Sequence, residues 1–228
     1  STFAIFSPAI AKLLGKGQRA DIEKFLYRVS KLVLIATMPI FLIIVILSKE
    51  ILSIFGKEFE MGNATLLILA SSFLFNSFIG FAGQVLGVMG RSKLILINSV
   101  GASFVNIFLN YILIPKYGII GAAFATGSSI FFINVARTIE IYILENLSII
   151  NSSVIKPLFI GVTTGCIVFY LQKLLKYQLG LSYLIFFVLI ILIIYFLLTW
   201  LFVFNDEDKQ YLFNLAEKGK ELFLSFAK

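Results

Sequence analysis

The sequence has 228 residues, of which 60 % are hydrophobic and 14 % are charged, and its net charge is +7. Soluble domains are roughly 45–50 % apolar and about 25 % charged. A soluble fold of this length cannot hide so much apolar surface, which excludes a soluble enzyme, a disordered chain and a collagen-like fibre. The composition predicts a polytopic membrane protein, and its basic residues are then expected to report topology rather than a nucleic-acid partner.

Side chains suited to catalysis or metal binding are scarce. Cys166 is the single cysteine and the sequence has no histidine, which excludes an internal disulfide, histidine-dependent catalysis and an imidazole metal site. Cation-coupled carriers usually have a carboxylate inside the membrane, and no acidic residue lies in the middle of an apolar stretch here. We therefore expect no enzyme activity, no cofactor and no metal.

The two ends of the chain are expected not to cross a membrane in full. Residues 1–14 are typical of the end of a transmembrane helix, so we expect a fragment or a processed half of a longer protein. Residues 15–31 predict a cytoplasmic amphipathic segment, because apolar residues recur at i, i+3, i+4 and i+7 from Ile22. We expect that face to lie on the membrane, with packing against the protein as the alternative. Residues 205–228 predict a cytoplasmic amphipathic tail helix for the same reason.

Between these segments, residues 32–204 contain six apolar stretches that approach the length needed to cross the hydrocarbon core as a helix. None of them alternates apolar and polar residues as the strands of a membrane barrel do. We predict an all-α fold, a polytopic membrane helix bundle with about six full transmembrane helices and a partial N-terminal one. The six stretches are residues 32–47, 66–88, 94–114, 119–144, 155–175 and 181–204.

Lysine and arginine are divided unevenly between the two sides that six spans define. Fourteen fall on one side and five on the other. The richer side is cytoplasmic by the positive-inside rule, and the C-terminus lies on that side. We therefore predict a multi-pass protein of the cell membrane. The fourteen are Lys12, Lys16, Arg19, Lys24, Arg28, Lys31, Arg91, Lys93, Arg137, Lys156, Lys209, Lys218, Lys220 and Lys228.

Four of the six stretches carry small or polar residues at helical spacing, whereas residues 181–204 are almost purely apolar and predict a lipid-facing anchor. Polar side chains inside a membrane need partners or water. They can hold helices together, or they can line a water-filled cavity that admits a sugar, and the sequence leaves both interpretations open. The candidate cavity residues are Asn76, Gln84, Ser99, Ser103, Asn106, Asn110, Asn134 and Arg137.

Arg137 is the strongly basic residue inside a helical run, and Glu140 follows it by one turn. The two can form an i, i+3 pair at the cytoplasmic interface. Alternatively, Arg137 can contact an anionic, lipid-linked substrate.

The connection between the third and fourth stretches has the residues of a tight reversal. Pro115 is expected to end the third span because it has no N–H for the helical ladder. Gly118 permits a positive φ, and Gly121 lets the next helix pack closely.

The most specific run is GQVLGVMGRSKLILINSVGASFVNIFLNYILIPKYGIIGAAFATGSS, residues 83–129. It is similar to the C-terminal half of O-antigen and teichoic-acid exporters, polysaccharide-biosynthesis proteins of the multidrug/oligosaccharidyl-lipid/polysaccharide superfamily. Residues 6–34 resemble the basic cytoplasmic loop and next helix of these flippases, and residues 55–78 resemble their external loop and following helix.

The resemblance implies a flippase whose two lobes move a lipid-linked oligosaccharide between leaflets by alternating access. This chain corresponds to most of the second lobe, and the substrate is expected to meet it together with the first lobe. Two other functions remain open. One is a lobe of a multidrug antiporter of the same superfamily, and the other is a non-transporting membrane scaffold in glycan assembly.

Overall fold

The computed structural model describes residues 10–13, 15, 19–148, 151–175 and 181–205, and the predictions for residues 1–14 and 205–228 lie largely outside them. The regular elements in this part of the chain are helices. Six of them are long and apolar enough to cross a membrane, which confirms the predicted polytopic bundle. The elements are α2 (Arg19–Phe55), the 3₁₀ helix η1 (Lys57–Gly62), α3 (Asn63–Ile79), α4 (Ala82–Val88), α5 (Ser92–Tyr117), α6 (Ile119–Glu145), α7 (Ser152–Leu175) and α8 (Leu181–Phe202).

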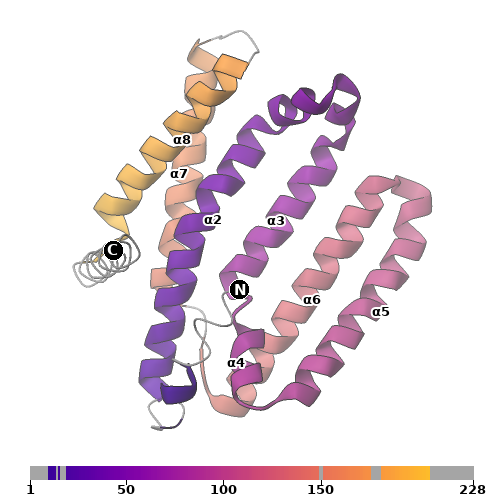
Figure 1. The fold of residues 1–228 in the computed structure, drawn as a ribbon, viewed down its shortest axis with the longest axis vertical. Coiled ribbons are helices and arrows are strands. Elements are labelled where there is room, and N and C mark those ends of the chain that lie inside the picture. The colour runs from indigo at the N-terminus through magenta and orange to yellow at the C-terminus, as the bar shows by residue number, and fades with distance from the viewer. Residues whose placement is uncertain (1–9, 14, 16–18, 149–150, 176–180, 206–228) are drawn as a thin grey trace, which may run out of the picture.

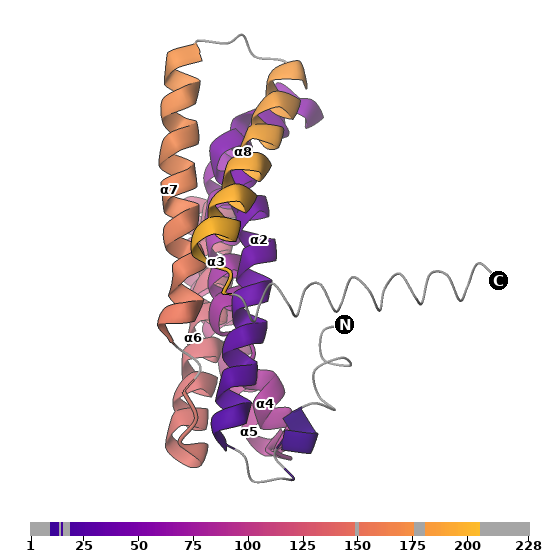
Figure 2. The same cartoon turned by 90° about the vertical axis from the view of Figure 1, so that its left-hand side faces the viewer.

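The long helices stand side by side in a flat row (Figure 1). From one edge, α5 packs on α6, α6 on α3, α3 on α2, and α2 on both α7 and α8. Figure 2 shows the row nearly edge-on, with α7 and α8 nearest the viewer. In this arrangement α6 lies between α3 and α5, so a polar residue on α6 can reach either neighbour.

Two apolar cores hold the row together. One joins the start of α2 to α4 and the end of α6, and includes Leu26, Val85 and Ile141. The other joins α2, α7 and α8, and includes Met38 and Phe187. Because α2 contributes to both cores, it is the central support of the bundle.

The first predicted span is longer than the sequence pattern indicates. Residues 19–31 and the apolar stretch that follows form one helical element of 37 residues, which is kinked at Leu47. Ile22, Leu26 and Val29 are buried in the core with α4 and α6. The apolar face of this segment therefore packs against the protein, and the expectation that it lies on the membrane was wrong.

The second predicted span, residues 66–88, is divided. Helix α3 ends at Ile79 and α4 begins at Ala82. The N–H of Gly80 still donates to the carbonyl of Asn76, at 2.7 Å, and the helical ladder restarts at Phe81. A glycine within an apolar run weakens a helix, because it has no side chain to restrict the backbone.

The reversal after α5 matches its prediction only in part. Gly118 has φ = 57°, which confirms the positive φ expected there. Pro115 does not end the helix, which continues to Tyr117. A proline in the last turn removes one helical hydrogen bond, and the neighbouring residues can keep their helical conformation.

The basic residues gather at the two ends of the row in the pattern that the topology requires. The start of α2, the α4–α5 turn with Arg91 and Lys93, and the start of α7 lie at one end. Helix η1 with Lys57 and the α5–α6 turn with Lys116 lie at the opposite end. Which end faces the cytoplasm stays a prediction.

Candidate functional site

Asn134 joins α6 to α3. Its Nδ2 donates to Asn76 Oδ1 at 2.9 Å and to the carbonyl of Ile130, also at 2.9 Å. Asn134 is 1 % exposed, so this amide is placed inside the bundle, where a lost partner is costly. Two of the candidate residues thus form a direct contact between helices.

Arg137 lies about one turn further along α6 and reaches α5. Its Nη2 donates to Ser99 Oγ at 3.3 Å. Its Nη1 lies 2.8 Å from the point where a Cβ on Gly83 would stand, so the missing side chain on α4 makes room for the guanidinium. Its Nε is buried and has no hydrogen-bond partner within the described part of the chain. One donor of this cation is therefore unused.

Glu140 and Asn98 form a second bond between α6 and α5. Asn98 Nδ2 donates to a carboxylate oxygen of Glu140 at 2.7 Å. Arg137 and Glu140, which the sequence allowed to pair with each other, are thus each directed toward α5. The sequence pattern did not identify Asn98, because the polar ladder that begins at Ser99 lies on an adjacent face of α5. An amide buried in an apolar run was the signal that could have identified it.

A cleft of about 490 Å³ lies between α5 and α6. Ser99, Ser103 and Asn106 line it on α5, and Ser129, Ile130 and Ile133 are among the residues on its α6 side. The serine hydroxyls on α5 bond to backbone carbonyls of their own helix, at 2.8 and 2.9 Å. The sequence-predicted ladder therefore faces an open groove rather than a tightly packed helix.

The two remaining candidate residues, Asn110 and Gln84, do not line this cleft. Asn110 Nδ2 donates to Asn106 Oδ1 at 2.9 Å, one turn apart on α5. Gln84 follows Gly83 on α4, and its Oε1 is buried with no hydrogen-bond partner in the described residues. Among those residues, no group of three His, Cys, Asp or Glu side chains is placed to hold a metal ion.

A second cleft of similar volume, about 490 Å³, lies between α3 and α6 and was not predicted. Ser72, Ser128 and Phe131 are among its lining residues. On α6, Ser128 and Ile130 differ by about 200° around the helix axis, so the two clefts open on different sides of α6. Arg137 follows Ile133 by four residues, about 40° around the helix axis, and lies about 180° from Ser128, so it is closer to the α5 cleft than to the α3 cleft.

The contact between Asn76 and Asn134 can be tested by a double-mutant cycle with the Asn76→Ala and Asn134→Ala variants. We expect a coupling free energy of about 0.6 kcal/mol, the average for hydrogen bonds between membrane helices, and at most about 1.7 kcal/mol, the largest value measured. The measurement is unfolding of the reconstituted chain in denaturant. Additive effects of the two substitutions would show that the amides do not interact.

The spans, the flat helical row and the polar contacts between α3, α6 and α5 define a polytopic helical membrane protein with a polar groove. The MatE family model matches residues 6–112. The probable low-salt glycan biosynthesis flippase Agl15 of Haloferax volcanii is 31 % identical over 123 residues, which are 54 % of this chain and 26 % of that protein. The uncharacterized membrane protein MJ1068 of Methanocaldococcus jannaschii is 30 % identical over 128 residues, 55 % of this chain and 25 % of that protein.

The fold is similar to that of the lipid II flippase MurJ in its inward closed conformation. The TM-score is 0.66 at 18 % sequence identity, and the match covers 88 % of this chain and 44 % of MurJ. The chain is thus similar to flippases of the superfamily that the MatE model represents, in part of its sequence and in most of its fold. The chain matches only about a quarter of the length of Agl15 and of MJ1068, and less than half of the length of MurJ.

Proposed function

We propose that the chain forms one lobe of a flippase that moves a lipid-linked oligosaccharide across the cell membrane. The observation that carries the proposal is Arg137, a cation inside a membrane span. Its Nη2 donates to Ser99, which lines the polar groove, and its buried Nε has no hydrogen-bond partner among the described residues. Ionisable residues within membrane spans generally mark substrate or ion pathways. The similarity to Agl15 and to MurJ supports the same function.

The groove has two kinds of polar group that suit such a substrate. A guanidinium presents a planar fork of donors that matches phosphate oxygens, and the carrier lipid of an oligosaccharide holds its sugar through phosphate. Hydroxyl and amide side chains such as Ser103 and Asn106 can both donate to and accept from sugar hydroxyls. In this proposal, Arg137 contacts the anionic linkage, and α5 provides the wall along which the sugar moves.

We further place the protein in polysaccharide biosynthesis, among exporters that resemble those for O-antigen and teichoic acid. In this proposal it is a transporter without enzyme activity, and its C-terminus lies in the cytoplasm. The other lobe completes the cavity, because this chain spans less than half of a MurJ-like fold.

The proposal is tested by expressing the gene, in its full extent, in a strain that lacks its own flippase. We expect surface glycan to be restored. Absence of glycan despite confirmed membrane insertion would contradict the proposal. Cation-dependent dye efflux without glycan would instead identify a multidrug antiporter. A scaffold would copurify with a glycan-assembly complex and would tolerate substitutions in the groove.

Water access to the groove can be measured with cysteine substitutions in a Cys166→Ala background. We expect Asn106→Cys and Asn110→Cys to react with a water-soluble thiol reagent at least about tenfold faster than Leu192→Cys in the lipid-facing α8. A matched control is Phe108→Cys, since Phe108 is exposed on the opposite side of α5 at the same depth. Equal, slow labelling at all four positions would remove the cavity interpretation for this ladder.

A further inference from the structure

We propose that the start of α2, together with the end of α8, binds the headgroup of an anionic phospholipid. Lys24, Arg28 and Lys31 recur at i, i+4 and i+7, so they share one face of α2, here named the basic stripe. The opposite face carries Ile22 and Leu26, which are fixed in the core with α4 and α6. The orientation of the basic stripe therefore follows from the packing of α2 and is independent of the proposed function.

The depth of the basic stripe fits a layer of lipid headgroups. Helix α8 ends at Phe202, and Phe204 lies against α2, with its ring centre 6.0 Å from Lys31 Nζ. The apolar span that α8 provides therefore stops at the level of Lys31. From Lys31 to Lys24, α2 continues outward by about 10 Å. Lipid phosphates occupy this zone just beyond the hydrocarbon core.

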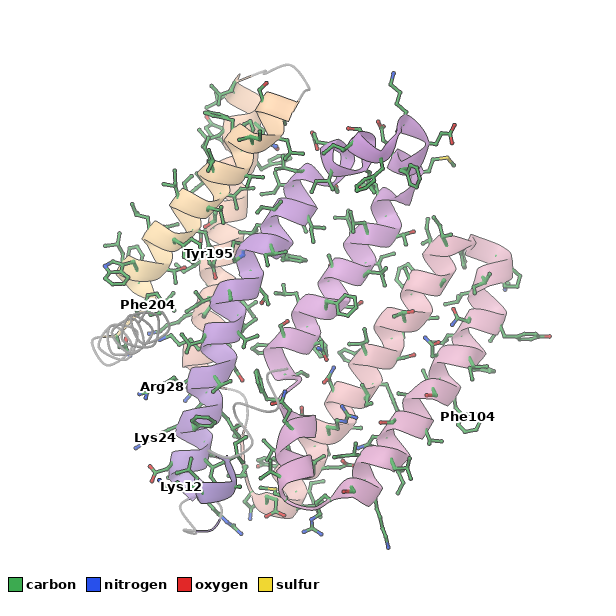
Figure 3. All side chains as sticks on the ribbon, viewed as in Figure 1. Lys12, Lys24, Arg28, Phe104, Tyr195 and Phe204 are labelled. Carbon is green, nitrogen blue, oxygen red and sulfur yellow. The ribbon has the colours of Figure 1, made fainter. Side chains whose placement is uncertain are left out.

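Among the described residues around the stripe, basic side chains outnumber acidic ones. Figure 3 shows Lys12, Lys24 and Arg28 along the same side of the lower part of α2, below Phe204. Lys12 and Lys24 are exposed and Arg28 is partly exposed. Asp21 is the acidic residue of α2 nearest to this face, so basic groups are in excess within the described part of the cluster. Each basic residue close to an anionic membrane surface attracts it by about 1 kcal/mol.

The apolar surface next to the stripe favours a lipid over a soluble anion or an acidic peptide. Trp200 is 52 % exposed, and its ring centre lies 5.8 Å from that of Phe204. Lys31 is 5 % exposed, so Trp200 and Phe204 form an apolar surface beside the accessible residues of the stripe, Lys24 and Arg28. A phospholipid can place its phosphate on the stripe and its acyl chains beside Trp200, whereas a soluble phosphate would use the basic end alone.

Trp200 is the single tryptophan of the chain and reports directly on the neighbouring lipid. The chain is reconstituted in vesicles of phosphatidylcholine and phosphatidylglycerol, in which one or the other lipid has brominated acyl chains that quench tryptophan on contact. We expect quenching to show at least about a fivefold preference for phosphatidylglycerol, the factor that ~1 kcal/mol from one basic residue gives. The preference should fall as salt is raised, because salt screens exposed charges.

Two variants separate the basic stripe from the overall charge. Lys12→Gln with Lys24→Gln removes the two exposed lysines of the cluster and should lower the preference by at least about fivefold, the factor for one basic residue. Lys57→Gln with Lys116→Gln removes the same charge at the opposite end and should keep it. Equal quenching by both lipids in the unchanged chain would overturn the proposal, as would an equal loss of preference in both variants. The Lys24→Gln single variant, which alters one exposed side chain, repeats the test if the double variant does not fold.

Discussion

Replacing Gly121 by alanine is expected to lower the thermal stability of the chain. A Cβ at Gly121 would overlap the carbonyl oxygen and carbon of Leu113, which belong to the backbone of α5. A backbone group cannot rotate away as a flexible side chain can, so the two helices must separate. Overpacking of this kind costs about 1–3 kcal/mol, occasionally more.

For a chain of this size, 1 kcal/mol corresponds to about 2–4 °C in Tm, so we expect a fall of roughly 2–12 °C. Heating of the detergent-solubilised protein, followed by size-exclusion chromatography, measures it. Gly101→Ala is the matched control: the same methyl group would meet only the ring of Phe132, at 3.5 Å, which is an ordinary contact. If both variants have the same Tm as the unchanged protein, α5 and α6 do not approach each other closely at Gly121.

The membrane spans could be predicted from the sequence because the solvent dictates them. Each backbone group must bond within its own helix in lipid, so every long apolar run becomes a helix, as α5 to α8 show. The reversal at Gly118 could be predicted for a similarly local reason, since a positive φ there needs glycine.

The division between α3 and α4 and the length of α2 depend on tertiary packing and could not be predicted. Hydropathy does not distinguish a continuous helix from one interrupted at Gly80. It also does not show whether an amphipathic face meets lipid or protein. Leu26 is apolar in either case, and only the position of α4 decides that it is buried in a core.

The candidate site was predictable as a set of polar residues but not as a set of contacts. Helical spacing placed Ser99, Ser103 and Asn106 on one face, and the structure puts them in one cleft. The partner of Arg137 could not be read in the same way. Glu140 is its neighbour along the helix, but Ser99 on α5 accepts its hydrogen bond, because helices pair side by side and the sequence does not state which faces meet.

Replacing Arg137 by glutamine is expected to reduce glycan transport by about 10–100-fold. Hydrogen bonds to a charged group contribute about 1.5–3 kcal/mol, and each 1.4 kcal/mol changes an affinity by a factor of ten. Glutamine keeps a donor that can reach toward Ser99 but removes the cation and the unused Nε donor. The measurement is the rate of surface-glycan recovery in the flippase-deficient strain, corrected for the amount of protein in the membrane.

Two further substitutions distinguish a role in transport from a role in folding. Arg91→Gln removes a cation of the same kind from an exposed pair with Glu145, at 3.2 Å, and should change transport by less than about fivefold, because surface ion pairs contribute at most ~1 kcal/mol. Arg137→Lys keeps the charge but loses the planar fork, and should retain an intermediate rate. If Arg137→Gln lowers the yield and Tm of the protein while the transport per molecule stays unchanged, then Arg137 holds α5 to α6 and does not contact the substrate.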